Sequence, residues 1–297
     1  MKLDRKALRA FVHKKIAAER EMLGAEGIEK ILEAGLQWEL APTLNAGGAI
    51  VFPHAGLSAC GYQIAAAVHA CLECDADRVL VIGVLHALSD ELQDARVRVA
   101  AGGNLIHEAY WGIQGPDLGG PDSWRYEFSL ANFLFLFEEE RKRRGIKGPE
   151  LIVRYPYLAG GRPMALPRID ELQEIVKDAA VVSTAAPYHH GLGYGDAPDV
   201  ALAPEAGGLK LAYQTIQEGL DLLRAGDYWG YNQHCVAAKS DARDAGQVMR
   251  YLLGPLNGRI LDLTYDDTTK LYNQPAPTWV ATALIERLPD KRPASGG

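Results

Sequence analysis

The sequence is poor in cysteine, has no long apolar run and carries no excess of basic residues. Four cysteines in 297 residues do not suggest a disulfide framework. The single CxxC pair, Cys71 and Cys74, has no second pair to complete a zinc site. No apolar stretch approaches the roughly 18 residues of a membrane span. A formal net charge of −7 argues against a nucleic-acid surface, which needs a basic stripe to neutralise phosphates. We therefore expect neither a membrane nor a nucleic acid as partner.

The beginning of the chain also has no apolar core of the signal-peptide type. MKLDRKALRAFVHKK instead has the spacing of an amphipathic helix, so we expect a cytoplasmic protein. The hydrophobic content of 48% and the charged content of 23% are ordinary for a globular chain with a sizeable core.

Apolar stretches of strand and helix type alternate along the chain. Residues 47–54 and 78–87 have the pattern of buried strands, and residues 64–73 between them have that of a helix. A strand, a helix and a strand in this order indicate a parallel sheet with a right-handed crossover. We predict an α/β fold, a single three-layer α/β/α domain with a central, mostly parallel mixed sheet, over residues 1–290. Residues 291–297 are expected to form a loose tail.

The remaining elements follow from the same patterns. We expect a hairpin over residues 95–106, a helix at 129–144, a strand at 150–158 and a helix at 168–178. A strand over 179–190 is expected to end in histidines. Helices at 209–223, 225–235 and 241–254 and closing strands at 259–267 and 277–288 complete the chain.

Histidines follow three of the expected buried strands. His54 follows AIVFP, His86 follows VLVIGVL, and the pair His189 and His190 follows VVSTAAPY. The carboxyl ends of parallel strands form the edge at which α/β sheets bind ligands. Neutral imidazoles that converge there are candidate ligands of a divalent metal. The alternative for each is a hydrogen-bonded histidine at a strand end. His107 with Glu108, and His234 with Cys235, are weaker alternative sites.

The stretch PHAGLSACG resembles the PHAGYxxxG signature of the Memo family, which shares its fold with the class III extradiol ring-cleaving dioxygenases. The resemblance extends from about Gly47 to Leu288. RVLVIGVLHAL resembles a family strand that ends in Gly-Pro-Ser-His, and YEFSL falls where the family has His-Ser-x-Glu-x-His-Leu. VVSTAAPYHHG resembles Val-Ser-Ser-Asp-x-x-His-x-Gly, although Ala186 replaces the aspartate. The chain therefore resembles a divergent member.

The resemblance implies a metal site built from separate parts of the chain. His54 and His86 would be metal ligands, and His189 would be the acid/base histidine, with His190 as the competing choice. The remaining ligand, cysteine in Memo proteins and glutamate in the dioxygenases, falls at Ser240. Serine is a poor ligand for iron, so the neighbouring Asp241, or the alternative Asp244, would supply a carboxylate. For either aspartate, capping of the following helix is the competing interpretation.

Two histidines and one carboxylate are typical of non-haem Fe(II) oxygenases. The resemblance thus implies an iron dioxygenase that acts with O2 on a small catechol-like or phenolic aromatic substrate. Copper and zinc are alternative metals. The alternative functions are a Memo-like metal-binding or signalling protein without ring cleavage, and a metal-dependent hydrolase. Large α/β enzymes often pair, so a homodimer is one of the oligomeric states compatible with the sequence.

Further residues near these motifs are candidates for the substrate pocket. Glu127 is expected to orient a histidine or to contact substrate, with an ion pair to Arg125 or Arg154 as the alternative. Aromatic side chains suit a planar phenolic ring, with core packing as the alternative for each. The aromatic candidates for substrate binding are Trp124, Tyr126, Tyr188 and Tyr194.

Overall fold

The computed structural model describes residues 5–87, 89–103, 110–119, 122–273 and 275–290. The expected C-terminal tail and the alternative site residues His107 and Glu108 lie outside these ranges. Of the helices within them, none is both long enough and apolar enough to cross a membrane.

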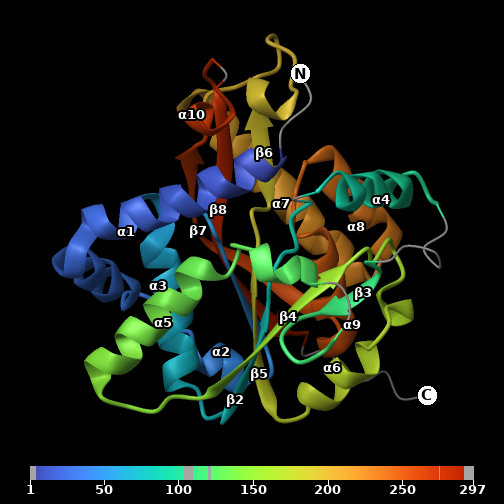
Figure 1. Cartoon of the computed structure of the whole chain (residues 1–297). Helices are drawn as coiled ribbons and strands as arrows, with labels where there is room; N and C mark the ends of the chain where they lie inside the picture. The colour runs from blue at the N-terminus through green and yellow to red at the C-terminus, as the bar shows by residue number, and fades with distance from the viewer. Residues whose placement is uncertain (1–4, 88, 104–109, 120–121, 274, 291–297) are drawn as a thin grey trace.

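The centre of the molecule is a mixed eight-stranded sheet, which confirms the predicted α/β class (Figure 1). Its strands are β1 (Ala49–Phe52), β2 (Arg78–Ile82), β3 (Gly112–Gln114), β4 (Glu150–Tyr157), β5 (Ala179–Thr184), β6 (Tyr188–Gly191), β7 (Leu256–Asp267) and β8 (Thr278–Pro289). The order is β3-β4-β2-β5-β1-β8-β6, and β7 also pairs with β8. The core strands β4, β2, β5 and β1 are parallel, and the outer pairings are antiparallel.

Helices cover both faces of this sheet. They are α1 (Arg5–Gly35), α2 (Ala41–Asn45), α3 (Leu57–Glu73), α4 (Asp90–Ala100), α5 (Ala131–Arg144), α6 (Ile169–Ile175), α7 (Gly208–Ala225), α8 (Tyr228–Ala237), α9 (Arg243–Leu253) and α10 (Thr269–Tyr272). Figure 1 shows α1, α3 and α5 on one side of the sheet and α7, α8 and α9 on the other. The arrangement is the expected three layers.

The alternation of side chains along β2 explains why this strand reads as a continuous apolar run. Val79 and Val81 pack into the core on the side of α3 and α5, whereas Leu80 and Ile82 pack toward α7 and α9. Successive side chains of a strand point to opposite faces, so a strand covered on both faces needs apolar residues throughout.

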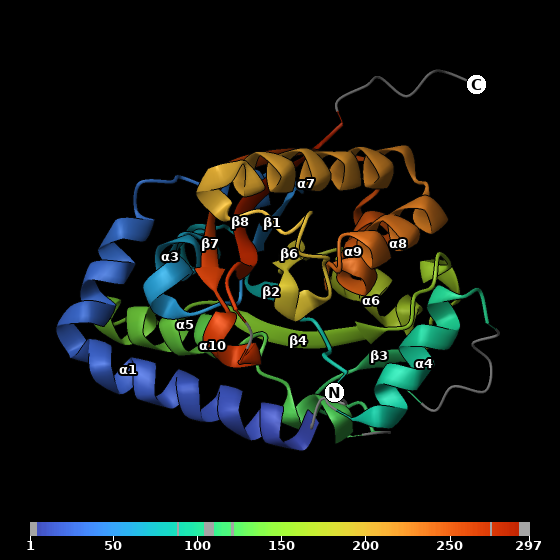
Figure 2. The same cartoon turned by 90° about the horizontal axis from the view of Figure 1, so that it is seen from above.

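The carboxyl ends of β1 and β2 meet at one edge of the sheet. Figure 2 looks onto this edge and shows α1 running along one side of it, with α10 between α1 and β7. Helix α1 bends at Gly24, whose φ is 58°, and its parts before and after the bend run in different directions. The sheet therefore brings the two strand-end histidines to an edge that α1 flanks.

The prediction of a hairpin over residues 95–106 is wrong where the structure describes it. Residues 90–100 form helix α4, and the Oγ atom of Ser89 accepts a hydrogen bond from the Leu92 backbone N–H at its first turn. Asp90 and Glu91 follow in that turn, where negative charge is favourable. This capping signal outweighs the strand-like alternation of the valines that follow.

The prediction of one strand over residues 179–190 is also wrong. Strand β5 ends at Thr184, and β6 begins at Tyr188 and runs antiparallel to β8. Pro187 has no N–H to donate to a ladder. The N–H of Ala186 donates to the side chain of Asp241 instead, at 2.7 Å. The histidine pair therefore lies on a separate strand and not at the end of a parallel one.

We predict that Phe52→Ala destabilises the protein by about 3–5 kcal/mol, because it removes a fully buried ring. Phe52 lies two residues before His54, and its ring stacks on that of Phe133 at 4.6 Å between centroids. Urea unfolding measures the loss. Met22→Ala, at a side chain that is 72% exposed, is the control and should change stability by less than about 0.5 kcal/mol. Equal stability of the two variants would contradict the assignment of Phe52 to the core.

Candidate metal centre

His54 lies just beyond β1 with one ring nitrogen held by a neighbouring strand. Its Nδ1 is 3.0 Å from Oγ1 of Thr184, the last residue of β5. The Thr184 hydroxyl donates its own hydrogen to the Phe52 carbonyl oxygen at 3.0 Å. The Thr184 oxygen therefore accepts from Nδ1–H, and this fixes the tautomer in which Nε2 has a free lone pair.

His86 lies beyond β2 and is held in the same manner by a carboxylate. Its Nδ1 is 2.8 Å from Oε1 of Glu127, and its backbone N–H donates to Oε2 of the same residue at 2.6 Å. The ring stacks on Phe128 at 4.4 Å between centroids. A carboxylate on Nδ1 is the usual partner of a metal-binding histidine, because it fixes the ring and leaves Nε2 for the metal.

Asp241 lies in the segment between α8 and α9, and its side chain faces the Nε2 atoms of His54 and His86. Its Oδ1 accepts the N–H of Ala186, and its Oδ2 lies 3.0 Å from Nε2 of His54 and 3.6 Å from Nε2 of His86. The side chain is 8% exposed, and within the part of the chain that the structure describes Oδ2 has no hydrogen bond of acceptable geometry despite these short distances. Oδ2 is thus a buried acceptor that faces two imidazole nitrogens.

These three side chains can hold a metal ion. One donor atom from each of His54, His86 and Asp241 lies within 4.8 Å of the other two. A buried carboxylate oxygen without a hydrogen bond, opposite two nitrogens whose rings are oriented from behind, fits a cation bound between them. The sequence prediction that His54, His86 and a carboxylate near residue 240 converge is met by Asp241.

The charges at this point stabilise each other. Burial lowers the pKa of His86, but the carboxylates of Glu127 and Asp241 outweigh burial and raise it to about 10. Burial raises the pKa of Asp241, but the neighbouring His54 and His86 outweigh burial and hold that pKa well below its usual value. Asp241 is therefore ionised at neutral pH, as a metal ligand must be.

A pocket of about 280 Å³ opens in front of His54 and His86, which both line it. Helix α1 forms one wall and α4 contributes a cation. Helix α10, β7 and β8 close the other side. The residues that line the pocket are Leu8, Val12, Lys15, Ile16, Glu19, His54, Ala55, Gly56, His86, Ala87, Gln93, Arg96, Phe128, Ala186, His189, Tyr194, Asp266, Thr268, Leu271 and Val280.

Of the two candidate acid/base histidines, the structure places His189 in this pocket. Its Nδ1 is buried and has no hydrogen-bond partner among the described residues, and its ring packs edge-on against Tyr194 at 4.8 Å between centroids. Burial lowers the pKa of His189 to about 4. The imidazole is neutral at physiological pH and has an unused buried nitrogen.

His190 and Tyr188 point to the other face of β6, as alternate residues of a strand must. Nδ1 of His190 lies 3.0 Å from Asp196 Oδ2 and 2.9 Å from the Tyr188 hydroxyl, and its Nε2 accepts the N–H of Leu202. Both side chains pack against Trp279 in the core. The expectations of a catalytic His190 and a substrate-binding Tyr188 are corrected to structural roles.

The other expected pocket residues are only partly brought together. Tyr194 lines the pocket, where its hydroxyl accepts a hydrogen bond from Thr268. Glu127 is buried behind His86 and orients that ring without lining the pocket. Trp124 and Tyr126 lie away from it, and Tyr126 is 52% exposed beneath the guanidinium of Arg9.

The alternative ligands Ser240 and Asp244 have other partners. The Ser240 Oγ accepts the N–H of Ala242, and Asp244 accepts the N–H of Ala159 through Oδ1. Arg96 lies 3.8 Å from the other oxygen of Asp244. Neither belongs to the set of donors around His54.

His234, a weaker alternative, bonds the Thr215 carbonyl oxygen outside this pocket.

Sequence reasoning missed the contribution of helix α1. Glu19 accepts the N–H groups of Leu57 and Ser58 at the start of α3, next to the His54 loop. Asp266 of β7 accepts the N–H of Gly56 in the same loop. A carboxylate at the first turn of a helix has no fixed sequence distance from it, so no local motif marks these contacts.

A comparison with models of known protein families gave no match, and a search of curated proteins found no significantly similar sequence. The family resemblance of the motifs therefore stays a prediction.

We predict that Asp241→Asn lowers the affinity for a divalent metal by about 100-fold or more, beyond the 10–100-fold typical of an outer partner of a ligand. Asparagine keeps the acceptor for Ala186 but loses the charge that faces the two histidines. Titration with Co(II) or Zn(II) measures the affinity. Asp244→Asn is the matched control, since Asp244 is also buried and also accepts a backbone N–H. A similar loss in both variants would contradict the assignment.

Metal affinity should rise about tenfold per pH unit between pH 7 and pH 9. His86 carries a proton below its raised pKa of about 10, and the metal must displace that proton. Glu127→Gln removes one of the carboxylates that raise this pKa, so the rise with pH should become shallower. Metal titrations at several pH values test both statements. A flat wild-type profile would contradict the proton on His86.

Proposed function

We propose that this protein is a non-haem Fe(II)-dependent dioxygenase that acts on a small catechol-like or phenolic substrate. The observation that supports this most is the set formed by His54, His86 and Asp241, with Nε2 of each ring and one carboxylate oxygen directed to a common point. Two histidines and one carboxylate on one side of a metal leave open positions for substrate and O2, as in Fe(II) oxygenases.

The pocket supports a small aromatic substrate. Its volume of about 280 Å³ suits a single ring with short substituents. Phe128 lies against His86 and Tyr194 lies against His189, so both add aromatic surface to the pocket. Val12 and Ile16 of α1 add apolar surface. Aromatic and apolar walls remove a planar ring from water, which favours binding.

The residues of the chain have distinct roles in this proposal. When bound, Fe(II) supplies Lewis acidity toward a phenolic oxygen and the redox chemistry of O2. Thr184 and Glu127 keep the ligand rings in the orientation that exposes Nε2. His189 is a neutral base within the pocket and accepts a proton from the second hydroxyl of the substrate, then returns it in a later step. Helix α1 forms one wall of the pocket and limits access of water from that side.

The test is metal analysis of protein purified without oxygen, followed by O2 uptake with a panel of catechols. We expect about one equivalent of iron and uptake that depends on a catechol. His54→Ala should lose both the iron and the uptake. His189→Gln should keep the iron and lose at least about 100-fold in turnover, because it removes only the proton transfer.

His234→Gln is the matched control, since this histidine lies outside the pocket. It should keep both iron and turnover. Iron-loaded protein without O2 uptake on any catechol would contradict the proposal and favour the metal-binding role. Zinc-dependent hydrolysis without O2 uptake would contradict it in favour of a hydrolase.

A further inference from the structure

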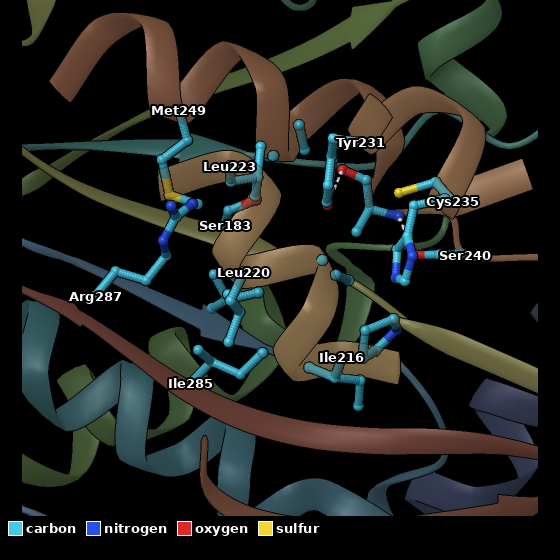
Figure 3. A pocket seen from close by; sticks show the side chains of 18 of the residues that line it. Ser183, Ile216, Leu220, Leu223, Tyr231, Cys235, Ser240, Met249, Ile285 and Arg287 are labelled. Atoms are coloured by element: carbon cyan, nitrogen blue, oxygen red, sulfur yellow. Dashed lines mark hydrogen bonds between the residues drawn. The ribbon is translucent and has the colours of Figure 1, made fainter. Parts of the chain in front are cut away.

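A second cavity, of about 40 Å³, lies between the sheet and helices α7, α8 and α9 (Figure 3). Its lining includes Thr215, Leu220, Leu223, His234, Ile285 and Arg287, and no aspartate or glutamate is among the described residues that line it. The wall is mostly apolar and holds one permanent charge, that of Arg287.

Arg287 is fully buried and has no hydrogen-bond partner for its guanidinium. Its Nε, Nη1 and Nη2 are all buried nitrogens without an acceptor within the described part of the chain. Figure 3 shows the side chain reaching from β8 toward Met249 at one end of the cavity. A buried guanidinium without an acceptor is strongly unfavourable, so this arrangement is expected only where something else supplies one.

The nearest carboxylate in sequence cannot serve as that acceptor. Glu286 precedes Arg287 on β8, so its side chain points to the opposite face of the strand. There Glu286 accepts hydrogen bonds from the guanidinium of Arg259 and from the hydroxyl of Thr43. The two neighbouring charges of β8 therefore belong to different environments.

The guanidinium remains charged in this environment. Burial lowers the pKa of Arg287 to about 10, with opposing effects from the Tyr231 phenol and the Arg250 guanidinium. That value is well above neutral pH, so the cavity contains a positive charge under physiological conditions.

The cavity has a charged inner end and a less buried outer end. Leu220, Leu223 and Ile285 are buried in its wall, whereas Thr215, His234 and Ser240 are partly exposed. A volume of about 40 Å³ is several times the roughly 10–15 Å³ that one water needs, and thus accommodates a few heavy atoms.

We propose that this cavity binds a short aliphatic monocarboxylate, with its carboxylate paired to Arg287 and its alkyl chain against Leu220 and Ile285. A guanidinium binds a carboxylate through two parallel hydrogen bonds, which satisfies nitrogens that otherwise have no acceptor. The apolar wall distinguishes an alkyl carboxylate from chloride, which offers charge alone. The inference stands apart from the proposed dioxygenase activity and involves none of the metal-binding side chains.

Thermal unfolding of the full chain tests the proposal at constant ionic strength. The salts are sodium formate, acetate, propionate, butyrate and chloride, with gluconate as an anion too large for the cavity. We expect the melting temperature to rise by about 5 °C or more at a saturating short carboxylate and to change little with gluconate. The effect should increase from formate to propionate as more apolar surface is buried.

Two variants separate this site from the rest of the surface. Arg287→Met should abolish the carboxylate effect and, without carboxylate, melt no lower than wild type, because it removes an unpaired buried charge. Arg259→Met is the matched control on the neighbouring strand and should keep the effect, since Arg259 is 70% exposed and pairs with Glu286.

A second measurement on the wild type keeps the proposal testable if Arg287→Met does not fold. Carbon-13-labelled acetate should give nuclear Overhauser contacts to the methyl groups of Leu220. Their absence at saturating acetate would overturn the proposal. Equal stabilisation by chloride and by all carboxylates, or an effect that persists in Arg287→Met, would also overturn it.

Discussion

The candidate site depends on the burial of one carboxylate, that of Asp241. An ionised group at 8% exposure needs compensation. One oxygen accepts the Ala186 N–H, and the proton that His86 carries below its pKa of about 10 lies near the other. The first contact requires that β5 stop at Thr184, so that the N–H of Ala186 is not used in the sheet. The end of β5 at Thr184 therefore also determines where the Asp241 side chain is held.

The two histidines are oriented by groups from elsewhere in the chain. Thr184 fixes His54 from the neighbouring strand β5, and Glu127 fixes His86 from a segment 41 residues further along the chain. Because both contacts use Nδ1, both rings direct Nε2 to the same point. Substitution of either outer residue would alter ring orientation without removing a donor atom. The geometry of the candidate metal centre therefore depends on five side chains, those of His54, His86, Asp241, Thr184 and Glu127.

Sequence patterns predicted the sheet and the strand-end histidines but not every element. The apolar runs of β1 and β2 are long enough and regular enough to identify buried parallel strands, and His54 and His86 follow from them. The hairpin prediction fails at α4 because the alternation of Val97 and Val99 resembles that of a strand, whereas the cap at Ser89 begins a helix. The sequence alone does not show which of His189 and His190 lines the pocket. That choice depends on β6, whose successive side chains point alternately to the pocket and to the core.

By itself, the sequence determined the α/β class and the two histidines that end parallel strands, because local periodicity and a strand end are properties of neighbouring residues. Only the tertiary structure decided that Asp241 is the carboxylate of the candidate metal centre, that His189 faces the pocket and that α1 forms one of its walls. Those choices depend on side chains far apart in the chain and on desolvation, which no local pattern encodes. The same holds for Arg287, whose unmet hydrogen bonds exist only because α7, α8 and α9 close over β8.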